Sequence, residues 1–130
     1  GVRLYSINDS ECIVKVRHSW INQNPFKSMF WAVQGMAAEM TTGAFLTREI
    51  NLSGENISML VSNNTAKFTK KATGKIRFVC TKGLEVKKLI QKAVDTGDSQ
   101  TLWIDSIGYN EDNLMVSHFS FEWSVKTRKK

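Results

Sequence analysis

One acid, Glu39, stands alone in an otherwise uncharged stretch at residues 28–47, SMFWAVQGMAAEMTTGAFLT. A carboxylate inside a buried helix is costly unless it is paired or hydrogen-bonded, and the cost is tolerated mainly where the group is used or lines a cavity. Such a group suits general acid–base chemistry, so we predict a catalytic role for Glu39. The alternative is that Glu39 points to the rim of the helix and meets a lysine from a strand.

A second candidate lies at the start of the same apolar stretch. Asn24 is a favourable N-cap and Pro25 fits the first turn, so the pattern predicts a helix at residues 25–46. The backbone N–H groups from Phe26 to Met29 would then lack partners within the helix. Together with the helix dipole they could polarise a carbonyl oxygen, as an oxyanion hole does. In the simpler interpretation Asn24 only caps the helix.

Several lysines surround a predicted strand break in the segment AKFTKKATGK. Lys67, Lys70 and Lys71 precede Gly74, and lysines at such a kink can hold phosphate groups as point charges. A solvated strand end is the alternative interpretation.

The elements that must position these residues follow from the hydrophobic pattern. The stretch at residues 28–47 has no polar face at the helical period, which predicts a core helix buried nearly all round. Its glutamine, glutamate, threonine and glycine residues make it too polar to span a membrane. Alternation typical of strands, or a helical spacing of apolar residues, marks the other elements. Strands are predicted at residues 12–18, 57–68, 73–80, 101–107 and 114–125, a short helix at 85–94 and a hairpin turn at 110–113.

These elements predict an α+β domain in which a curved antiparallel sheet wraps one long helix. At 130 residues, with 42% hydrophobic and 23% charged residues and no internal linker, the chain fits a single domain over residues 1–130. The exposed edges of such a sheet make dimerisation through an edge strand a reasonable expectation.

Charge and cysteine content indicate which partners and which cellular compartment to expect. Part of the formal charge of +6 belongs to a basic tail at residues 126–130, which we expect to be a solvent-exposed terminus. The other lysines are spread along the chain, so nucleic acid is not an expected partner. Cys12 and Cys80 lie in apolar runs, which predicts buried free thiols in a cytoplasmic protein, and no signal peptide is visible.

No spacing of histidine and cysteine resembles a zinc site, and no nucleophilic serine motif or phosphate-binding glycine loop is present. No metal or cofactor is therefore expected. The tryptophans fall within apolar segments and are predicted to belong to the core. They are Trp20, Trp31, Trp103 and Trp123.

The stretches NPFKSMFWAVQGMAAEMTTGAFL and AKFTKKATGKIRF resemble the hot-dog-fold acyl-CoA thioesterases, with the likeness extending over about residues 10 to 125. The closest branch comprises uncharacterised bacterial proteins related to phenylacetyl-CoA thioesterase. In this family an acid four residues before a glycine on the central helix activates water or attacks the thioester, and Glu39 with Gly43 has that spacing. The resemblance also implies an active site at a dimer interface and places the strand break, Lys70 to Gly74, near the phosphates of coenzyme A.

The chain departs from the family in lacking the His-Gly-Gly of phenylacetyl-CoA thioesterases. A shifted alignment would place Gln34 where the family has its acid.

The resemblance implies hydrolysis of an acyl-CoA in a homodimer or a dimer of dimers. In that reading Glu39 and Asn24 are catalytic. The substrate-binding set is Phe26, Ser28, Gln34, Lys67, Lys70, Lys71 and Gly74. The alternative is a non-catalytic hot-dog domain that binds acyl-CoA or an acyl carrier protein.

Overall fold

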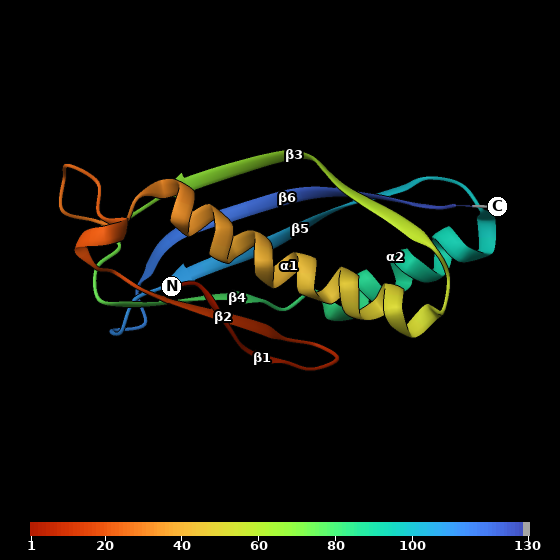
Figure 1. The fold of residues 1–130 in the computed structure, drawn as a ribbon, viewed down its shortest axis with the longest axis horizontal. Coiled ribbons are helices and arrows are strands. Elements are labelled where there is room, and N and C mark those ends of the chain that lie inside the picture. The colour runs from red at the N-terminus through yellow and green to blue at the C-terminus, as the bar shows by residue number, and fades with distance from the viewer. Residues whose placement is uncertain (129–130) are drawn as a thin grey trace.

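The computed structural model describes residues 1–128, which form an antiparallel sheet, two α-helices and one short 3-10 helix (Figure 1). In chain order the elements are β1 (Arg3–Ile7), β2 (Cys12–Arg17), η1 (Trp20–Asn22), α1 (Trp31–Ser53), β3 (Ile57–Phe68), β4 (Lys75–Cys80), α2 (Gly83–Thr96), β5 (Gln100–Tyr109) and β6 (Met115–Thr127). The predicted strands and both predicted helices are present. Strand β1 and helix η1 were not predicted.

Within the described residues the six strands form one sheet in the order β1-β2-β4-β5-β6-β3. Each strand runs antiparallel to its neighbours. The alternation of side chains decides which face is buried: Ile76 and Phe78 of β4 lie in the core, whereas Lys75 and Arg77 point to the opposite face. The predicted hairpin joins β5 to β6, with Asn110 donating its N–H to the Leu114 carbonyl at 3.0 Å.

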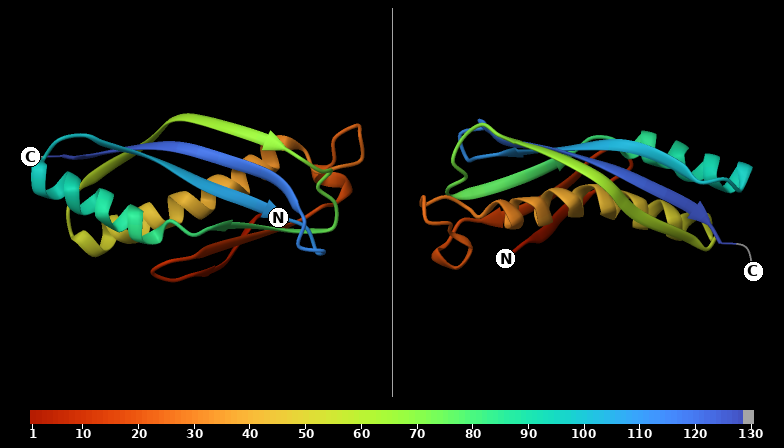
Figure 2. Two further views of the ribbon diagram at one scale, coloured as in Figure 1. Left: turned by 180° about the vertical axis from the view of Figure 1, so that it is seen from behind. Right: turned by 90° about the horizontal axis from the view of Figure 1, so that it is seen from above.

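Helix α1 lies along one face of the curved sheet, and α2 packs beside it (Figure 2). Residues Ala38, Thr42 and Phe45 of α1 are buried against the strands. The opposite side is open, because Glu39 is exposed and Met36 is 61% exposed. The prediction of a helix buried nearly all round was therefore wrong for the single chain. Neither described helix combines the length and hydropathy that a membrane crossing requires.

The start of α1 was also predicted wrongly. The helix begins at Trp31, with Phe30 as the N-cap residue, and not at Pro25. An asparagine side chain can fold a tight turn as readily as it caps a helix. Asn24 does the former: its Oδ1 accepts the N–H of Phe26 at 2.9 Å. Lys27 takes a left-handed φ of 60°, which ends any helical run there.

Three of the four tryptophans predicted to lie in the core are exposed instead. Only Trp123 is buried, on the face of β6 that meets α1, whereas Trp20 is 83% exposed. Trp31 and Trp103 are also exposed. The predicted basic tail begins inside a strand, because Lys126 pairs with Ser58 of β3. Lys129 and Lys130 lie outside the described residues.

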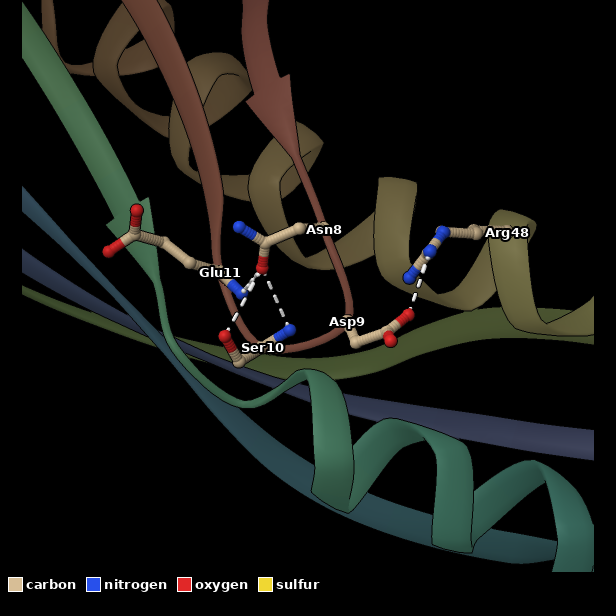
Figure 3. A network of polar contacts seen from close by, with 5 residues as sticks. All are labelled: Asn8, Asp9, Ser10, Glu11 and Arg48. Atoms are coloured by element: carbon tan, nitrogen blue, oxygen red, sulfur yellow. Dashed lines mark hydrogen bonds and ion pairs between the residues drawn. The ribbon is translucent and has the colours of Figure 1, made fainter.

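The turn between β1 and β2 is tied to α1 by an ion pair, which Figure 3 draws in close view. Asn8 Oδ1 accepts the backbone N–H groups of Ser10 and Glu11, and Arg48 of α1 contacts Asp9 at 2.8 Å. This turn also touches the start of α2, because a Cβ on Gly83 would lie 2.2 Å from the Asp9 carbonyl oxygen. Strand β1 is thereby held at the edge of the sheet.

Candidate functional site

A cavity of about 420 Å³ opens where the segment before α1 meets the connection between β3 and β4. It combines an apolar wall with several amides, hydroxyls and lysines. Its lining residues are Asn24, Phe26, Ser28, Met29, Trp31, Gln34, Phe68, Thr69, Lys70, Lys71 and Ala72. Six of the nine predicted site residues are in this set, so the fold brings together groups that the sequence places up to 47 residues apart.

Asn24 organises one side of the cavity. Its Nδ2 donates to Ser28 Oγ at 3.0 Å, and its Oδ1 accepts the N–H of Ser28 at 3.3 Å. The Met29 N–H donates to the Ala72 carbonyl at 2.8 Å, which joins this segment to the β3–β4 connection. Asn24 therefore holds the cavity wall in shape, and no geometry here shows it acting on a substrate.

The predicted oxyanion hole at residues 26–29 was wrong, because all four N–H groups have partners. Phe26 and Ser28 donate to the Asn24 side chain, Lys27 to the Asn24 carbonyl and Met29 to Ala72. The open donors lie further along the chain. Among the described residues, none accepts the N–H of Trp31 or Ala32 at the true start of α1, where the helix dipole favours negative charge.

Gln34 is the buried polar group of this site. It is 4% exposed, and its Nε2 donates to the Met29 carbonyl at 3.3 Å. Its Oε1 is buried and has no partner among the described residues. A buried acceptor without a donor is costly, and a water molecule or a ligand O–H or N–H that reached Gln34 Oε1 would offset that cost.

The lysines divide between two places. Lys71 Nζ donates to the Phe26 carbonyl at 3.1 Å and so links the two segments that line the cavity, and Lys70 also lines it. Lys67 lies on the exposed part of β3 and Gly74 near the start of β4, and neither lines the cavity. Gly74 has a φ of 73°, which favours glycine, and its carbonyl accepts the His18 N–H at 2.8 Å.

Glu39 does not line this cavity. It lies on the open side of α1, five residues beyond Gln34, which is a rise of about 7.5 Å along the helix axis. Within one chain the structure thus separates the predicted acid from the predicted substrate-binding residues.

The two thiols are unsuited to nucleophilic chemistry. Cys12 of β2 lies directly opposite Cys80 of β4, and both are buried free cysteines, as predicted. Burial raises the pKa of the Cys12 thiol from 9.0 to about 12, and it raises the pKa of Cys80 from 9.0 to about 11. Both therefore stay protonated at neutral pH. Among residues 1–128, no three His, Cys, Asp or Glu side chains gather as metal ligands would.

The sequence reasoning included Phe26 and missed the two other aromatic residues of the cavity. Phe68, the last residue of β3, and Trp31, the first residue of α1, both line it. Phe68 stands directly before the predicted strand break, which was the available signal. Trp31 offered none, because an exposed and a buried tryptophan look the same in an apolar run.

The comparisons with known proteins concern family and fold. The family model described as Domain of unknown function (DUF4442) matches residues 1–125. No protein of curated function matches the chain by sequence. The solved structure of a protein of unknown function from Chlorobaculum tepidum TLS is similar with a TM-score of 0.84 and 14% identity, covering 98% of this chain and 83% of that one.

Two further solved structures carry more informative names. A probable thioesterase from Pseudomonas aeruginosa has a TM-score of 0.74 at 14% identity, with coverage of 98% and 83%. The PaaI protein of the E. coli phenylacetic acid degradation operon has a TM-score of 0.66 at 14% identity, with coverage of 94% and 81%. The TM-scores establish a shared fold, and at 14% identity a shared fold does not imply a shared function. The chain belongs to the DUF4442 family and has the hot-dog fold of these thioesterase-like proteins, as the sequence predicted.

Proposed function

We propose that this protein hydrolyses the thioester of an acyl-CoA and that the reacting group lies at the cavity before α1. One observation carries the proposal: the fold gathers Asn24, Ser28 and Gln34 beside Lys70 and Lys71 at the end of a long helix whose first N–H groups are open. An amide-lined cavity with adjacent cations suits a ligand that has a carbonyl group and phosphates. The likeness to proteins named as thioesterases supports this class of reaction.

In the proposed reaction the Glu39 carboxylate removes a proton from water, and the water oxygen bonds to the thioester carbonyl carbon. The N–H groups of Trp31 and Ala32 stabilise the oxyanion that forms. The carbon–sulfur bond then breaks, and Glu39 returns its proton to the leaving thiolate, which gives a carboxylic acid and coenzyme A. Gln34 Oε1 accepts a hydrogen bond from the attacking water.

Because Glu39 lies outside the cavity of its own chain, the proposal requires a second copy. Strand β3 has one unpaired edge, and most of its length is exposed. The open side of α1 carries the exposed Met36 and Met40. An exposed edge strand and exposed methionines each favour pairing of two chains. Glu39 of one subunit then serves the cavity of the other, and a dimer of dimers remains compatible with this arrangement.

A panel of acyl-CoAs with a thiol reagent tests the activity. We expect steady release of coenzyme A, and a loss of about 10² to 10⁴ in kcat for Glu39→Gln, the range for removal of a general base. Glu55→Gln, an exposed acid just after α1, is the matched control and should retain activity. Equal rates for wild type and Glu39→Gln would refute the assignment of the base.

A second function has one observation in its favour. No carboxylate is among the residues that line the cavity, which fits a domain that binds acyl-CoA or an acyl carrier protein without cleaving it. Saturable binding of coenzyme A without turnover, equal in wild type and Glu39→Gln, would decide for this alternative.

A further inference from the structure

Strands β1, β2 and β4 lie side by side at one end of the sheet (Figure 1). Their register places five basic residues together on the face that points away from α1. They are Arg3, Lys15, Arg17, Lys75 and Arg77. The pairing of strands brings them together: Arg3 is opposite Lys15, Lys15 is opposite Arg77, and Arg17 is opposite Lys75. Their neighbours Val14, Val16, Ile76 and Phe78 point the other way, into the core. We call these five residues the basic cluster.

Within residues 1–128 the side chains of the basic cluster are not paired with carboxylates, and the nearby Glu111 Oε1 accepts the backbone N–H of Lys75 at 3.0 Å. None of its members forms an ion pair with a carboxylate of the described residues, where the ion pairs are Arg48–Asp9 and His118–Asp105. Like charges directly opposite each other on neighbouring strands destabilise a sheet. Three such pairs in one place are therefore an arrangement that folding alone does not favour, and an anion bound between them would offset it.

The cluster surrounds a concavity. A cavity of about 520 Å³ is lined by four of its members, Arg3, Lys15, Arg17 and Lys75, together with Tyr5. Lys15 Nζ lies 3.4 Å from the centre of the Tyr5 ring, and the Arg77 guanidinium lies 4.8 Å from that of Tyr109. The aromatic rings hold these two cations in place. Lys15 keeps its hydrogen-bond donors for a ligand, whereas Arg77 Nη1 donates to the Asn110 carbonyl at 3.4 Å.

We infer that this cavity binds a small molecule carrying two or more phosphate groups, such as a nucleotide. Arginine matches phosphate oxygens with paired donors, and lysine adds point charge, so the two arginines and two lysines at the wall suit more than one phosphate. The volume is that of a small-molecule site. A long polyanion would instead call for a basic stripe that extends across the surface. The site is separate from the cavity before α1, and the inference does not depend on thioester hydrolysis.

The test is a calorimetric titration of the chain with adenosine 3′,5′-bisphosphate, with adenosine as the ligand that lacks phosphate. The titration is made in the background Lys70→Ala/Lys71→Ala, which removes the cations of the cavity before α1. We expect saturable binding of the bisphosphate at one site per chain, and none of adenosine. The double variant Lys15→Ala/Arg17→Ala should raise the dissociation constant at least tenfold. The control Lys87→Ala/Lys88→Ala removes the same charge from the exposed side of α2 and should change it less than twofold.

A thermal melt checks that the double variant Lys15→Ala/Arg17→Ala is folded. Removal of the opposed charges should leave the melting temperature of Lys15→Ala/Arg17→Ala unchanged or higher in the absence of ligand. Equal weakening by both double variants, or no saturable binding of the bisphosphate, would overturn the inference. Tighter binding of a single-stranded oligonucleotide with several chains per strand would also overturn it.

The source of the phosphates is decided by competition. If the cavity takes the nucleotide end of coenzyme A, coenzyme A will displace the bisphosphate, and Lys15→Ala/Arg17→Ala will raise the KM for an acyl-CoA. If a separate nucleotide binds there, the bisphosphate and coenzyme A will bind together. Loss of bisphosphate binding leaves the Glu39-dependent release of coenzyme A as a separate measurement, so the two proposals can fail independently.

Discussion

Helix α1 has two sides that differ in chemistry. The side against the sheet is closed: Ala37, Ala38, Phe45 and Leu46 are fully buried. The other side presents Glu39 and exposed methionines to solvent in the single chain.

The closed side also holds hydroxyl groups that are hydrogen-bonded to the strands. Thr42 Oγ1 accepts the Trp123 Nε1–H at 2.8 Å, and Thr41 Oγ1 is hydrogen-bonded to Ser106 Oγ at 2.7 Å. Contacts of this kind fix one orientation of the helix on the sheet. The closed side therefore provides the packing and hydrogen bonds that stabilise α1 on the sheet, whereas the open side leaves side chains exposed to solvent.

The largest expected effect on stability comes from truncating a buried side chain on the closed side. Phe45→Ala should lower the free energy of unfolding by about 3 to 5 kcal/mol, because it leaves a cavity in a fully buried core. Met36→Ala on the open side should change it by less than about 0.5 kcal/mol. Urea unfolding at a low protein concentration measures both, since dilution removes any contribution from a second copy. Similar losses of unfolding free energy for the two variants would contradict the difference between the two sides.

The threonine that holds the tryptophan should have the next largest effect. Thr42→Val keeps the shape of the side chain and leaves the buried Trp123 N–H without an acceptor, so the free energy of unfolding should fall by about 1 to 3 kcal/mol. Thr47→Val, at an exposed position of the same helix, is the control and should be nearly neutral. A neutral Thr42→Val would mean that water replaces the threonine.

The thiols beneath the closed side predict a dependence on pH. Their folded-state pKa values lie above the ordinary 9.0, so the protonated form is favoured by folding. This contribution is complete below about pH 9 and is lost as the pH rises toward 11 and 12. Cys12→Ala/Cys80→Ala should remove that part of the alkaline loss of stability in urea titrations from pH 7 to 11. An unchanged alkaline slope would count against it.

The smallest effect on stability is expected at the open side itself. Glu39→Gln should shift the free energy of unfolding by less than about 0.5 kcal/mol, because an exposed residue exchanges one polar group for another. Together with the loss of activity proposed above, this would assign Glu39 to function. A loss of stability comparable to that of Thr42→Val would instead make Glu39 a structural residue.

The residues of the candidate cavity were predicted better than its shape. Asn24 and Lys71 were identified from local chemistry and Gln34 from the family resemblance, and each lies in it. Their roles were less accessible, because an asparagine before a proline satisfies a helix cap and a tight turn equally well. The partner of the Met29 N–H is Ala72, which is distant in sequence, and no local rule gives that contact.

What the sequence determined by itself is most of the helices and strands and which face of a strand is buried. Alternation over residues 12–17 and 75–80 and the apolar run of α1 are local properties, since side-chain direction follows from the period of the backbone. Only the tertiary structure decided which side of α1 is covered and where charges gather. Lys15 and Arg77 became neighbours through the register of β2 with β4, and a register joins residues that the chain keeps far apart.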